Sequence, residues 1–111
     1  MVNVPESELT GFVQNLPGAL GELRRSLREL LDTFWDETYR SRVCEQASAL
    51  AQAAKLQGLV RIFTLSRALA SICFISREDA LPIRKEIGEK LRELMGMLDA
   101  ACEESLEEQA G

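Results

Sequence analysis

The side chains best suited to covalent chemistry or metal binding in this chain of 111 residues are its three cysteines, Cys44, Cys73 and Cys102. Their number is odd and their spacing is wide, whereas a disulfide framework needs paired cysteines and a zinc site usually needs closely spaced ligands. All three lie among apolar residues. We therefore expect buried free thiols in a reducing cytoplasm, and no metal site.

Acid–base and phosphate chemistry lack their usual residues in this sequence. It contains no histidine, the commonest general base and metal ligand. Asp36 and Glu37 are adjacent, but proximity in sequence does not make a general-acid pair. No nucleophile elbow, phosphate-binding glycine loop or metal-ligand spacing is present. The sequence predicts a protein without enzymatic activity and without a cofactor.

Trp35 and Tyr39 are of the residue types that are enriched in binding hot spots. They are four positions apart, so on one helix they would share a face. Two interpretations stay open, namely the edge of a core and a contact surface for a partner.

Length and composition limit the classes of partner. The net charge of −5 disfavours nucleic acid, because phosphate binding relies on a basic surface. No apolar run approaches the ~20 residues of a membrane span, and no basic and apolar leader precedes residues 2–8. We expect a single cytoplasmic domain spanning residues 1–111, with neither a membrane nor nucleic acid as partner.

Apolar residues recur in steps of three and four, which is the spacing of amphipathic helices. The clearest stripe is Leu16, Leu20, Leu23, Leu27, Leu30 and Phe34. Pro17 and Gly18 interrupt the apolar set at residues 9–16, so we expect a kink or a short turn there. Beyond residue 38 the stripe continues out of phase, through Val43, Ala47, Leu50 and Ala54. Because no glycine or proline marks a break, we expect one long helix that changes its packing face, rather than a connection at residues 40–42.

The second half of the chain predicts two more helices. Gly58 either ends the long helix or is a mid-helix glycine that lets a partner approach. Thr64 is expected to cap the next helix. A final amphipathic helix carries Ile83, Ile87, Leu91, Leu94, Leu98 and Ala101. The expected fold class is all-α, an antiparallel bundle of about four helices counting the short N-terminal one, with residues 1–8 and 103–111 frayed.

The alanine-rich stretch 47–72 contains one family-like motif. Its segment Ala53-Ala54-Lys55-Leu56-Gln57-Gly58 resembles the A-H-x-L-K-G motif of histidine phosphotransfer (HPt) domains, including that of chemotaxis histidine kinases. The resemblance covers roughly residues 47–98. Domains of that family are helical bundles that present a histidine to solvent, with a lysine that offsets phosphoryl charge and a glycine that lets a receiver domain approach. Here Ala54 replaces the histidine, Gln57 replaces the lysine, and Thr64 stands near the family's second glycine.

The resemblance implies a docking domain that does not carry phosphate, because alanine has no nucleophile and glutamine has no charge. It implies a receiver or kinase domain as partner, with Leu56 pointing inward, Gly58 pointing outward and Gln57 as a hydrogen-bonding contact. The alternative interpretation of this segment is an ordinary alanine-rich helix.

Two functional hypotheses follow. The first is a non-catalytic protein-interaction module, an HPt-like adaptor that docks such a partner. The second is a self-associating, homodimeric helical scaffold, because the chain has more apolar stripes than so short a bundle covers alone. The expected contact residues are Trp35, Tyr39, Ala54, Gln57, Gly58 and Arg61.

Overall fold

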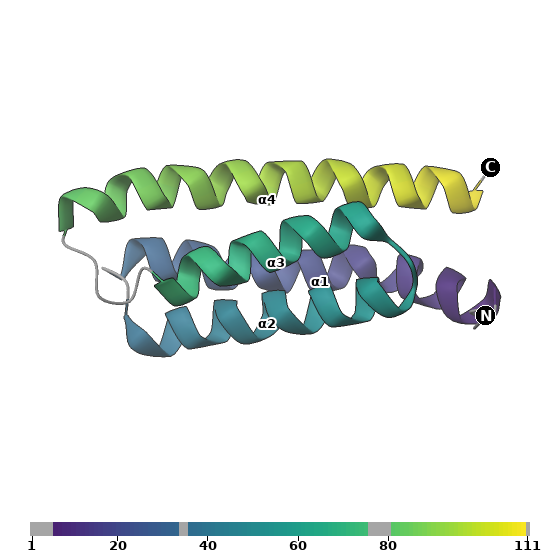
Figure 1. Cartoon of the computed structure of the whole chain (residues 1–111), viewed down its shortest axis with the longest axis horizontal. Helices are drawn as coiled ribbons and strands as arrows, with labels where there is room; N and C mark the ends of the chain where they lie inside the picture. The colour runs from purple at the N-terminus through teal and green to yellow at the C-terminus, as the bar shows by residue number, and fades with distance from the viewer. Residues whose placement is uncertain (1–5, 34–35, 76–80, 111) are drawn as a thin grey trace.

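The computed structural model describes residues 6–33, 36–75 and 81–110, which form helices and contain no strand. The four helices are α1 (Glu6–Asp32), α2 (Glu37–Leu56), α3 (Val60–Ile75) and α4 (Leu81–Ala110). Each runs opposite to the one before it, so the start of α1, the α2–α3 turn and the end of α4 lie at one end of the bundle (Figure 1). The predicted all-α, antiparallel bundle of about four helices is confirmed.

The core lies along the axis of this bundle. Helices α1 and α3 each pack against both α2 and α4, and the bundle measures 45 × 25 × 19 Å. The stripe predicted on α1 is buried, through Val13, Leu16, Leu20, Leu23, Leu27 and Leu30. Burying each such side chain stabilises the fold by roughly 1.5–3 kcal/mol, so this stripe is a principal part of the core.

The prediction of a separate short N-terminal helix is wrong. Pro17 lies inside α1, which is one helix from Glu6 to Asp32. Proline removes one backbone hydrogen bond from a helix interior. The buried residues Val13, Leu16 and Leu20 occur on both sides of it at helical spacing, so continuing the helix keeps the whole apolar stripe in the core.

The prediction of one long helix that continues from the first apolar stripe through residues 38–42 is also wrong. Helix α1 ends at Asp32 and α2 begins at Glu37, so the two helices separate before residues 38–42, which all lie within α2. The side chain of Asp36 caps α2 by accepting a hydrogen bond from the backbone N–H of Thr38 at 2.9 Å. This break explains why the apolar stripe changes phase. Phe34 and Trp35 lie outside the described residues, so the predicted common face of Trp35 and Tyr39 does too.

Of the two alternatives for Gly58, the structure shows the end of a helix. The residue has a φ of +73°, in the left-handed region that favours glycine. The N–H of Leu59 donates to the carbonyl of Ala54 at 2.9 Å, and the N–H of Gly58 donates to that of Lys55 at 3.1 Å. These two bonds form a Schellman motif. Helix α3 then begins at Val60, so the prediction that Thr64 caps it is wrong.

Helix α4 closes the bundle. Its stripe of Leu91, Leu94, Leu98 and Ala101 is buried as predicted, and it continues as helix to Ala110. The fraying expected at residues 1–8 and 103–111 stays a prediction. Within the described ranges, no helix has both the length and the apolar character that crossing a membrane requires.

Candidate functional site

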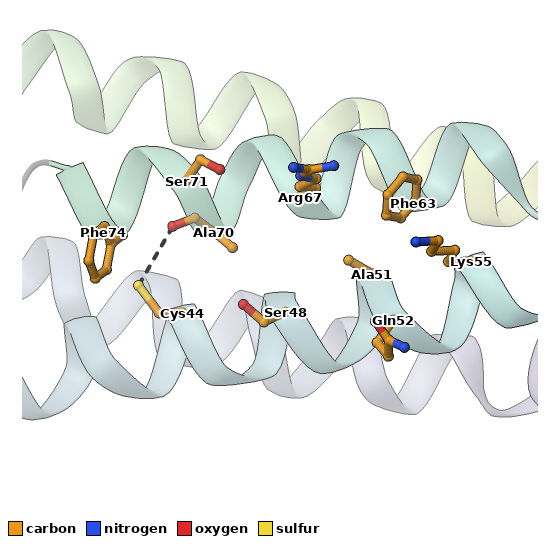
Figure 2. A pocket seen from close by; sticks show the side chains of 10 residues that line it. All are labelled: Cys44, Ser48, Ala51, Gln52, Lys55, Phe63, Arg67, Ala70, Ser71 and Phe74. Atoms are coloured by element: carbon orange, nitrogen blue, oxygen red, sulfur yellow. Dashed lines mark hydrogen bonds between the residues drawn. The ribbon is translucent and has the colours of Figure 1, made fainter.

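A groove runs between α2 and α3 on the outside of the bundle (Figure 2). It has a volume of about 620 Å³. Helix α2 supplies Cys44, Ser48, Ala51, Gln52 and Lys55, and α3 supplies Phe63, Arg67, Ala70, Ser71 and Phe74. None of these ten side chains is acidic. On a chain with a net charge of −5, the groove is therefore locally positive.

Helix α3 positions the groove residues because it carries two stripes side by side. The first, at helical spacing, is buried in the core and consists of Ile62, Ser66, Leu69 and Cys73. The second is displaced by one residue and lines the groove, with Phe63, Arg67, Ala70 and Phe74. Since neighbouring helix positions are about 100° apart, burying the first stripe places the second beside it, at the α2 contact.

The positive charge of the groove gathers around one aromatic ring. Lys55 Nζ lies 5.8 Å from the centroid of the Phe63 ring, and Arg67 Cζ lies 5.9 Å from it. In Figure 2 the ring lies between these two cations. Among the described residues, neither Lys55 nor Arg67 has a carboxylate within 4.0 Å, whereas Arg61 pairs with Glu104 at 3.2 Å. The two groove cations are therefore available to an incoming anion.

The thiols near the groove are held in the protonated form. Cys44 Sγ donates a hydrogen bond to the Ala70 carbonyl at 3.7 Å (Figure 2). Burial raises the pKa of Cys44, against the opposing effect of Arg40, and raises the pKa of Cys73 to about 12. Protonated thiols are weak nucleophiles at neutral pH. Among the described residues, no group of three or more cysteine or carboxylate side chains could hold a metal ion.

A second cleft, between α1 and α4, differs from the groove in its charge balance. Its volume is about 290 Å³, and its charged lining residues are Arg24, Arg28, Arg92, Asp32 and Asp99. Arg24 forms an ion pair with Asp99. The three arginines and two aspartates of this cleft leave a net charge of +1, and one arginine is already paired, whereas the α2–α3 groove carries two cations and no carboxylate.

Three of the predicted contact residues come together next to the groove. Gln57, Gly58 and Arg61 lie at the α2–α3 turn, at the end of the groove marked by Lys55 and Phe63. Gly58 and Arg61 are exposed, and Gln57 is half-buried. The prediction that Gly58 points outward is confirmed.

Two apolar side chains at this turn add a surface that the sequence did not predict. Leu56 is 65% exposed and Val60 is 72% exposed. The expected inward orientation of Leu56 is wrong, because the core stripe of α2 passes through Leu50 and Ala54 and a residue two positions further lies on the opposite face.

The other predicted contact residues are not part of this surface. Ala54 is fully buried, so its methyl group packs in the core and does not reach a surface. Tyr39 lies at the other end of α2, roughly 27 Å from Gln57 at 1.5 Å per residue, and its ring contacts Arg42 at 5.4 Å. Trp35 lies outside the described residues.

The contact residues expected from the sequence did not include the groove residues Lys55, Phe63, Arg67 and Phe74. The available signal was the second stripe on α3, with an aromatic, a cation and an aromatic at positions 63, 67 and 74. That stripe is recognisable only when the face buried in the core is known.

Comparison of the chain with protein-family models, with curated proteins and with solved structures finds no match.

Proposed function

We propose that this protein is a non-catalytic interaction module that binds a partner protein on its α2–α3 face. The observation that carries the proposal is the groove, with two cations around Phe63 and no acidic lining residue. Exposed apolar side chains extend the same face, because Leu56 and Val60 lie at one end and Phe74, 62% exposed, lies at the other. Aromatic residues and arginine, here Phe63, Phe74 and Arg67, are enriched at protein interfaces.

The narrower hypothesis, an HPt-like adaptor that docks a receiver or kinase domain, has mixed support. Gly58 and Arg61 are at the surface, as a docking turn requires. Ala54 stands where the family presents its histidine, yet it is buried, and Leu56 points outward. We therefore propose the interaction face without assigning the partner to the receiver or kinase class. The proposed cytoplasmic location is supported by the three cysteines, none of which forms a disulfide, since disulfides are rare in reducing compartments.

Self-association remains the second candidate function. It is supported by a further exposed apolar side chain outside the α2–α3 face, that of Met97 on α4, which is 43% exposed. A homodimer would cover such surfaces. The experiment below distinguishes this outcome from binding to a different protein.

The test uses a photo-crosslinking amino acid, p-benzoylphenylalanine, placed at Phe74 in the full chain and expressed in its native cells. The control carries the same amino acid at Arg25, an exposed position on α1, which lies diagonally across the bundle from α3. We expect a discrete crosslinked protein from position 74 only, and loss of that product when Lys55 and Arg67 are both changed to glutamate. Identical products from positions 74 and 25 would contradict the proposal.

A further inference from the structure

Granting the interaction face proposed above, we propose that the groove accepts an acidic amphipathic α-helix of the partner protein. The groove supplies two kinds of complementary surface for such a helix. Phe63 and Phe74 offer apolar contact, and Lys55 and Arg67 offer positive charge. The apolar and the cationic side chains lie in one row along α3 and the adjoining edge of α2 (Figure 2).

Charge complementarity indicates that the occupant is acidic. The chain has 18 acidic and 13 basic residues, yet the groove is lined by two basic residues and no acidic one. A basic partner helix would bring cations next to Lys55 and Arg67, and this repulsion between like charges is costly at an interface. Carboxylates on the partner would instead pair with both, in a site where no carboxylate of the described residues competes at short range.

The shape of the groove indicates that the occupant is a helix. Small side chains line its centre, namely Ser48, Ala51, Ala70 and Ser71, and they permit a third helix to approach the pair closely. Binding of an extended segment by strand addition would need a sheet edge, and the described residues contain no strand. A helix in a groove between two helices is an established mode of peptide recognition.

The positions of the groove residues specify the pattern that the partner helix must carry. Along α3, Arg67 lies roughly 10 Å from Phe74, and Phe63 lies roughly 16 Å from it, at 1.5 Å per residue. A helix lying along α3 therefore needs an apolar residue opposite Phe74 and a carboxylate about seven positions away, opposite Arg67. It needs a second carboxylate about eleven positions away, where Lys55 lies beside the Phe63 ring. These offsets are close to two and three turns, so all three side chains lie on one face.

The test uses synthetic peptides of about sixteen residues, long enough at 1.5 Å per residue to cover the groove. The acidic peptide has a leucine near one end, glutamates about seven and about eleven positions from it, and alanine elsewhere on that face. It is made in two versions, with the leucine near the N-terminus or near the C-terminus, so that both helix directions are tried. One control has the same composition with the glutamates on the opposite face, and another has lysines in place of the glutamates.

Binding to the full chain is measured by fluorescence anisotropy. We expect one acidic version to bind at least about tenfold more tightly than either control. Raising the salt from about 0.1 M to about 1 M should weaken it, because the Debye length falls from roughly 10 Å to roughly 3 Å. The double change Lys55→Glu and Arg67→Glu should reverse the preference, so that the lysine peptide binds better. The matched control, Arg25→Glu and Lys85→Glu, makes the same change in net charge at exposed sites on α1 and α4 and should leave the preference unchanged.

Two results would overturn the inference. One is equal binding of the acidic peptides and the displaced-glutamate control. The other is a preference for acidic peptides that the Arg25 and Lys85 variant loses as fully as the groove variant. If the acidic peptides fail while the crosslink from position 74 still forms, the occupant is not an acidic helix but the interaction face stands. If that crosslink joins two copies of this chain, self-association replaces a separate partner protein and the inference is wrong.

Discussion

Changing Gly58 to alanine tests the turn that joins α2 to α3 and separates the two interpretations that the sequence left open. Gly58 has a φ of +73°, and no heavy atom would lie within 4 Å of an added Cβ. The methyl group therefore meets no steric obstacle, and the whole cost comes from placing an L-residue in the left-handed region. That cost is roughly 1–2 kcal/mol. We expect Gly58→Ala to lower the free energy of unfolding by about 1 kcal/mol.

Gly96 provides the matched control. It lies inside α4, is exposed, and also has no heavy atom within 4 Å of an added Cβ. Because alanine is preferred over glycine in helix interiors, Gly96→Ala should raise the free energy of unfolding by about 0.5–1 kcal/mol. The same chemical change thus has opposite effects at two open positions, for reasons that depend only on backbone conformation.

The assay is urea unfolding followed by circular dichroism, with thermal unfolding as a second measurement. For a domain of this size, 1 kcal/mol corresponds to a shift of about 4 °C in Tm, so the two variants should move in opposite directions by about that amount. If Gly58→Ala stabilises the protein as Gly96→Ala does, residue 58 is helical. In that case α2 continues through it, and the Schellman turn described above is wrong.

Two further predictions concern buried polar groups. Within the described residues, the hydroxyl of Ser66 is buried and has no hydrogen-bond partner. Ser66→Ala should therefore raise the free energy of unfolding by about 1 kcal/mol, more than the control Ser48→Ala at an exposed helical position. A lower free energy of unfolding for Ser66→Ala in urea would contradict this. Burial raises the pKa values of Cys73 and Cys102 from 9.0 to about 12 and about 11. Below pH 9 both thiols are protonated in the folded and in the unfolded protein, whereas above pH 9 they lose their protons first in the unfolded protein. Stability should therefore fall as the pH rises from 9 towards 12, by about 1 kcal/mol per thiol at about pH 10, and Cys73→Ala should flatten the fall, whereas an unchanged slope would remove that thiol as a cause.

The helical stripes were predictable because an amphipathic helix needs apolar residues three and four positions apart in the sequence. Leucines at steps of three and four identified the buried face of α1, and the same rule identified α4. The number of helices came out right although two boundaries were wrong. Pro17 was expected to interrupt a helix and lies inside one, while the actual break at Asp36 depends on a side-chain cap and on no glycine or proline.

The candidate site was predictable only in part. Gln57, Gly58 and Arg61 are close in sequence and span one turn, so they were bound to lie near one another. Ala54 and Leu56 were assigned to the wrong sides, because the motif resemblance and the core stripe of α2 demand opposite orientations, and burial of the stripe prevailed. The cations at Lys55 and Arg67 are twelve positions apart on different helices, so no local pattern connects them.

The sequence by itself determined that this chain forms amphipathic helices, because each stripe of apolar residues can leave water only when the backbone is helical. It also determined that the chain has no histidine and a net negative charge. Only the tertiary structure decided that α2 and α3 lie side by side with Lys55, Phe63, Arg67 and Phe74 along one groove. The reason is that a groove forms from the faces left over after two helices have buried their core stripes, and the pairing of those faces is set by packing between helices.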